Sequence, residues 1–219
     1  MPVSLYGKKY LKTNRRVAYD VHMATHRPQP RELHAHAMDN LRYIRETLER
    51  AGSFTAVPGV GGVLMGCTAL LAAWMSAQHI SPASWLIVWT AAAGAALLIG
   101  IVGAALKSRK FNLALWSGPG RKFVAGFAPA MLAGAILTVV LFRAGMAGFL
   151  PGIWLLLYGA AIVSGGYSSV RVVPLMGACF MLAGSAALFL HGWNDLFLAA
   201  GFGGLHIVFG TVIAVKYGG

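Results

Sequence analysis

The pattern of hydrophobic and polar positions divides the chain into a polar first quarter and an apolar remainder. After residue 56, long apolar segments follow one another and are separated by short polar or Gly/Pro-containing stretches. About 20 apolar residues of α-helix cross the hydrocarbon core of a bilayer, which is about 30 Å thick. The pattern therefore predicts six transmembrane helices, over residues 57–78, 83–106, 123–142, 149–164, 172–190 and 196–215.

Residues 1–31 contain no apolar run of the kind that forms a signal peptide. Five Lys and Arg residues lie between positions 8 and 16, and Pro28 and Pro30 separate this stretch from the helix that follows. We expect a basic, disordered cytoplasmic leader. Translation from Met23 or Met38 instead of Met1 stays an alternative.

Residues 32–52 have the spacing of an amphipathic helix. Apolar residues recur at intervals of four and three positions and so share one helix face: Ala37, Leu41, Ile44, Leu48 and Ala51. Oppositely charged side chains four positions apart add support. We predict a cytoplasmic or interfacial helix whose face, formed by Leu41, Ile44 and Leu48, docks on a partner protein or on the membrane surface.

Residues 53–219 are then predicted to form the transmembrane domain. The fold class is all-α, an integral membrane bundle of six helices preceded by the cytoplasmic amphipathic helix. Composition agrees, because 58% of the residues are hydrophobic and only 11% are charged, whereas about 25% are charged in soluble domains.

The distribution of basic residues predicts the orientation in the membrane. The loops after the first, third and fifth spans lie on the side of the membrane opposite the N-terminal region. Of the 18 Lys and Arg residues, only Arg143 lies in one of these loops. The positive-inside rule therefore places both termini in the cytoplasm. The net charge of +12 favours contact with anionic lipid at that face. Nucleic-acid binding is not expected, because it needs a soluble basic face.

A weak internal repeat is present. Pro58-Gly59 opens the first span and Pro151-Gly152 opens the fourth, each with a further glycine eight residues after its proline. The third and sixth spans share the tripeptide Ala-Gly-Phe, at residues 125–127 and 200–202. Two three-span halves of opposite orientation are typical of many transporters. Chance recurrence in a chain this rich in Gly and Ala is the alternative.

Candidate chemistry inside the spans is sparse. No acidic or basic residue lies near the middle of a predicted span, and His206 in the sixth span is the one candidate for a ligand contact. Its imidazole either contacts a haem, metal or quinone, or forms a hydrogen bond to Ser, Thr or a backbone carbonyl across the bundle. Asp195 is expected to cap the start of the sixth span. We predict no catalytic set, no metal site and no cofactor.

The segment from His36 to Gly59, which contains Leu-Arg-Tyr-Ile-Arg-Glu-Thr at residues 41–47 and Phe-Thr-Ala-Val-Pro-Gly at residues 54–59, carries a resemblance. It resembles the signature of a family of uncharacterised bacterial multi-pass membrane proteins. The resemblance implies a bacterial inner-membrane location, and it transfers no activity.

Three hypotheses for function follow from these patterns. The first is a non-enzymatic membrane component whose N-terminal helix holds a cytoplasmic partner or rests on the membrane surface. The second is a transporter or channel for a small neutral solute, based on the repeat. The third is a haem- or quinone-binding redox subunit, based on His206 alone. Each is compatible with an oligomer.

Overall fold

The computed structural model describes residues 37–44, 57–78, 81–110, 116, 118–190 and 192–217, and every regular element among them is a helix. The chain divides into two compact units, Met1–Leu48 and Glu49–Gly219. In the first unit, residues 37–44 are helical and all eight are exposed. This segment contains Leu41 and Ile44 of the predicted docking face, whereas Leu48 lies outside the described residues.

Among the described residues of the second unit, six helical segments are long and apolar enough to cross a membrane, which confirms the predicted fold class. Three of them are single helices at the N-terminal side of the unit: α3 (Gly59–Ser76), α4 (Pro82–Lys110) and α5 (Gly118–Arg143). The fourth joins the short η1 (Ala147–Phe149) to α6 (Leu150–Gly166), and the fifth is α7 (Val172–Phe189). The sixth joins α8 (Asn194–Leu198), the π-helix η2 (Ala199–Leu205) and α9 (His206–Tyr217).

The basic segment between the second and third spans is more helical than the apolar pattern predicts. α4 continues to Lys110 instead of ending near residue 106, and α5 begins at Gly118 instead of residue 123. Lys and Arg are good helix formers, which accounts for the extension of α4 through Lys107, Arg109 and Lys110. α5 begins with Gly118, Pro119 and Gly120, and proline is tolerated in the first turn of a helix. One consequence is that Lys107 becomes part of α4 and is buried there.

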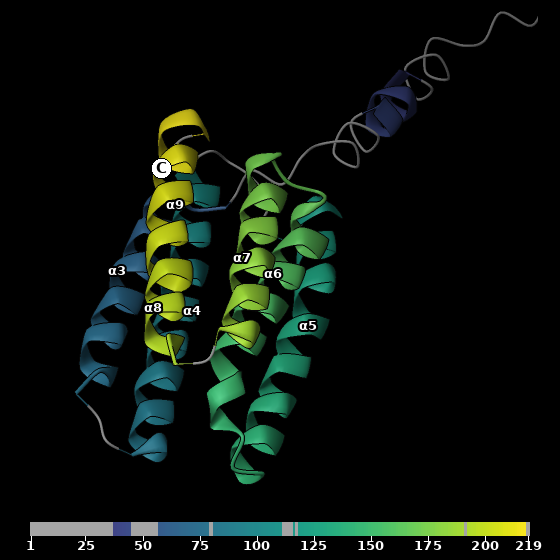
Figure 1. Ribbon diagram of the computed structural model, residues 1–219. Helices are drawn as coiled ribbons and strands as arrows, with labels where there is room; N and C mark the ends of the chain where they lie inside the picture. Colours follow the sequence, from purple (N-terminus) through teal and green to yellow (C-terminus); the bar gives the residue numbers. More distant parts are fainter. Residues whose placement is uncertain are drawn as a thin grey trace, which may run out of the picture. The chain divides into compact units, whose positions relative to one another are not determined.

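Helix packing in the second unit forms two groups of three. α3 packs against α4 and against the last span (η2 and α9), whereas α6 packs against α7 and α5 (Figure 1). The first three spans form one half of the unit and the last three form the other. Each group therefore combines the first two spans of one half with the third span of the other half. Exchanging the two halves, α3 for α6, α4 for α7 and α5 for the last span, leaves this packing pattern unchanged.

Glycines set the distance between the closest helix pairs. A Cβ atom on Gly66 of α3 would lie 2.7 Å from the carbonyl oxygen of Gly203, and one on Gly210 of α9 would lie 2.9 Å from that of Gly59. In the other group, a Cβ atom on Gly159 of α6 would lie 2.6 Å from the carbonyl oxygen of Gly177 in α7. Small residues let the helix backbones touch, so a side chain is excluded at each of these positions.

Candidate functional site

His206 lies at the end of the π-helix η2, on the inner side of the last span. Its side chain is 4% exposed. The seven residues of η2 include Gly201, Gly203 and Gly204, and glycine weakens the preference for the regular α-helix. π-helical turns occur often at functional sites, which makes His206 the first position to test for a ligand contact.

Both ring nitrogens of His206 have hydrogen-bond partners. Nδ1 lies 2.9 Å from the carbonyl oxygen of Phe202, and Nε2 lies 2.7 Å from the hydroxyl of Tyr158 in α6. A carbonyl oxygen can only accept, so the neutral ring carries its proton on Nδ1. Nε2 then accepts from the Tyr158 hydroxyl, and a neutral imidazole satisfies the whole arrangement.

Aromatic rings enclose this polar pair on several sides. The ring of Tyr158 lies 4.9 Å from that of Phe180, 5.2 Å from that of Phe202 and 6.0 Å from that of Phe127, in edge-to-face geometries. Phe180 is fully buried and also contacts the His206 ring at 5.2 Å. The pair and its ring shell therefore connect α5, α6 and α7 to the last span.

This geometry determines what His206 can bind. Nε2 uses its lone pair for Tyr158, so a metal or haem iron at that nitrogen would have to displace the tyrosine hydroxyl. Within the described ranges, no three His, Cys, Asp or Glu side chains come together in a way that could hold a metal ion. His79 and His191 lie outside the described residues. The surrounding rings keep Tyr158 and His206 in the positions in which they form their hydrogen bond.

A second polar cluster surrounds Asp195, and here the sequence-based prediction is wrong. Asp195 does not cap the last span: α8 begins after Trp193 without a side-chain cap, and Asp195 lies in its first turn. Its Oδ1 instead accepts from Nε1 of Trp85 at 2.8 Å and from the hydroxyl of Ser76 at 3.1 Å. The carboxylate thus ties together the end of α3, the start of α4 and the start of α8.

Stacked tryptophans extend this cluster to the other group of helices. The rings of Trp85 in α4 and Trp154 in α6 are nearly parallel, with centroids 5.3 Å apart. Nε1 of Trp154 donates to the hydroxyl of Thr138 in α5 at 2.8 Å. The Trp85–Trp154 stack therefore joins the two groups of three helices, as the Tyr158–His206 hydrogen bond and its ring shell also do.

No family model, curated protein or solved structure matches this chain.

The residues of the predicted docking face are placed only in part. Leu41 and Ile44 are 60% and 53% exposed, and Met38, on the same helix face, is 55% exposed. Sequence reasoning missed Tyr158 as the partner of His206. The position of Tyr158 within an apolar span could have indicated this pairing, because a tyrosine there needs a hydrogen-bond partner for its hydroxyl.

Proposed function

We propose that this protein is a non-enzymatic component of a bacterial inner membrane that uses its N-terminal helix to hold a cytoplasmic protein. The observation that carries the proposal is the apolar face of residues 37–44, where Met38, Leu41 and Ile44 are each more than half exposed. Spacings of three residues place these three side chains within one third of the helix circumference. An amphipathic helix with such a face is a common recognition element, which inserts into a groove of its partner.

The orientation in the membrane that the loop charges predict supports the same proposal. Seventeen of the 18 Lys and Arg residues lie in segments that the positive-inside rule assigns to the cytoplasm. The N-terminal helix would then face soluble cytoplasmic proteins and the anionic inner leaflet. Docking on that leaflet is the competing outcome, since an exposed apolar face between charged residues also binds membrane surfaces.

The experiment is capture of a partner by the full chain, extracted from native membranes in mild detergent. Leu41→Asp combined with Ile44→Asp should abolish capture, because a charge on the apolar face cannot enter an apolar groove. Tyr43→Asp is the matched control, since Tyr43 is 67% exposed on the opposite face of the same helix. The captured protein, purified separately, should bind a peptide of residues 32–52 and lose binding to the doubly substituted peptide.

Two results would contradict the proposal. Capture that survives the double substitution at normal expression would remove the helix as the docking element. A peptide that binds anionic vesicles but no captured protein would instead assign the apolar face to the membrane surface.

The second candidate function, transport of a small neutral solute, is favoured by the helix packing. Each group of three helices combines spans from both halves, and exchanging the halves leaves the helix pairing unchanged. This arrangement is expected of inverted repeats. Phe127 and Phe202, from the shared tripeptides, both contact Tyr158. Proteoliposomes should then take up neutral solutes faster than protein-free vesicles, measured by osmotic swelling. Equal rates for a series of solutes would count against transport.

A further inference from the structure

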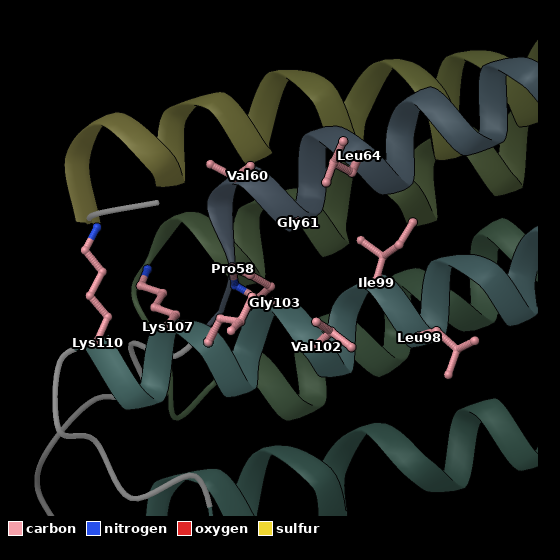
Figure 2. Close-up of a pocket in the computed structure, with 11 residues that line it drawn as sticks. Pro58, Val60, Gly61, Leu64, Leu98, Ile99, Val102, Gly103, Lys107 and Lys110 are labelled. Atoms are coloured by element: carbon pink, nitrogen blue, oxygen red, sulfur yellow. The ribbon is translucent and has the colours of Figure 1, made fainter.

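An elongated groove runs between α3 and the second half of α4. Its volume is about 540 Å³, and nine apolar residues and two lysines line it. Gly61 and Gly103 lie next to Pro58 where the two helices approach, since a Cβ atom on either glycine would contact the proline ring at about 3 Å or less. Leu98 and Val102 are 65% and 54% exposed and form the outer wall. Figure 2 shows the apolar side chains along the groove and both lysines at one end.

The groove has the length of one bilayer leaflet. It extends along α4 from Lys110 to Leu98, a separation of 12 positions, which corresponds to about 18 Å of helix. Half of a bilayer hydrocarbon core is about 15 Å. An acyl chain whose headgroup is at Lys110 would therefore reach the midplane near Leu98.

Charge distinguishes the two ends of the groove. Lys107 is 4% exposed and donates from Nζ to the carbonyl oxygen of Val57 at 3.0 Å, and Lys110 is exposed one turn further along α4. Among the described residues of the second unit, Asp195 is the one acidic residue, and it is engaged by Ser76 and Trp85 at the opposite end of α3. Lys107, Arg109 and Lys110 place three positive charges in the last turn of α4, and anionic lipid headgroups are attracted to such basic clusters. The lysine end therefore favours an anionic group.

We propose that this groove binds one anionic phospholipid of the leaflet that the loop charges predict to be cytoplasmic. Its acyl chain lies between α3 and α4, and its phosphate lies at Lys110 and Lys107. A helix of a second copy is a poorer occupant, because the described spans of this chain offer no carboxylate at the lysine end. The proposal is independent of the docking function of the N-terminal helix.

The test is photocrosslinking of the full chain in phosphatidylcholine vesicles that contain a diazirine-labelled phosphatidylglycerol. Mass spectrometry should find adducts on residues 58–64 and 98–106 more often than on the exposed α5 surface around Leu132. A phosphatidylcholine probe with the same labelled chain should mark the groove less. Lys110→Ala should reduce labelling by phosphatidylglycerol about fivefold, the loss expected for one lysine near an anionic headgroup.

Matched variants separate the site from general effects of charge and bulk. Lys122→Ala removes an exposed lysine at the start of α5 and should leave groove labelling unchanged. Val102→Trp should fill the groove and reduce labelling, whereas Leu132→Trp on α5 should not. Equal labelling by the two headgroups, or no effect of Lys110→Ala, would overturn the proposal. Crosslinks between two copies through residues 58–64 and 98–106 would overturn it in favour of a second chain.

Discussion

The hydroxyl of Tyr158 and Nε2 of His206 lie 2.7 Å apart, 48 positions apart in the chain. Tyr158 belongs to the group formed by α5, α6 and α7, and His206 belongs to the last span, which packs with α3 and α4. This hydrogen bond is therefore a contact between the two groups of three helices. It lies among the aromatic rings of Phe127, Phe180 and Phe202.

Tyr158→Phe should lower the free energy of unfolding by about 1 kcal/mol. The substitution keeps the ring contacts with Phe180 and Phe202 but leaves Nε2 of His206 without a donor in a buried site. Hydrogen bonds between membrane helices contribute about this much or slightly less. Reversible unfolding in mixed detergent micelles measures the change.

A double-mutant cycle with His206→Leu tests whether the two residues act through each other. Tyr158→Phe should cost much less in the His206→Leu background, because no ring nitrogen is then left without a partner. Purely additive losses would show that the 2.7 Å contact contributes nothing of its own.

Gly159→Ala should destabilise the bundle, although alanine is the better helix former. The new Cβ atom would lie 2.6 Å from the carbonyl oxygen of Gly177 and 2.7 Å from the backbone nitrogen of Met181, so α6 and α7 would have to separate, at a cost of about 1–3 kcal/mol. Gly94→Ala is the matched control, since nothing lies within 4 Å of a Cβ atom there. Thermal unfolding in detergent should show a lower midpoint for the first variant and an unchanged or higher one for the second.

The fold class could be predicted from the sequence, because the thickness of the bilayer sets the length of each apolar helix. Six apolar runs of sufficient length predict six helices, and six helical segments of the described residues are long and apolar enough to cross a membrane. Which helices pack against each other could not be predicted, because nearly every span is apolar on all sides. Glycines occur in many spans, so they do not indicate which helices pair.

The polar contacts were harder to predict for a different reason. Residues far apart in the chain contribute to each of them: Trp85 donates to Asp195 across 110 positions and Tyr158 to His206 across 48. A capping role for Asp195 rested on its local position alone. The structure satisfies the carboxylate with distant donors instead, because Ser76 and Trp85 belong to helices that end and begin beside it.

Asp195→Ala should destabilise the helix ends around Trp85 by about 1–3 kcal/mol, because the indole N–H loses its acceptor. Asp195→Asn should recover most of this loss, since its carbonyl oxygen can accept from the indole N–H. Reversible unfolding of the three proteins measures the difference. If Asn and Ala were equally destabilising, the negative charge of Asp195, and not the hydrogen bond from Trp85, would be what stabilises this end of the bundle.

Cysteine labelling in intact cells tests the orientation that the loop charges predict. Met146→Cys lies between the third and fourth spans and Tyr167→Cys between the fourth and fifth, at positions that are 44% and 90% exposed. In a background without Cys67 and Cys179, a membrane-impermeant maleimide should label residue 146 from outside and residue 167 only after permeabilisation. The physical reason is that basic segments stay on the cytoplasmic side during insertion. The reverse pattern would place the N-terminal helix outside the cell and would end its role in holding a cytoplasmic protein.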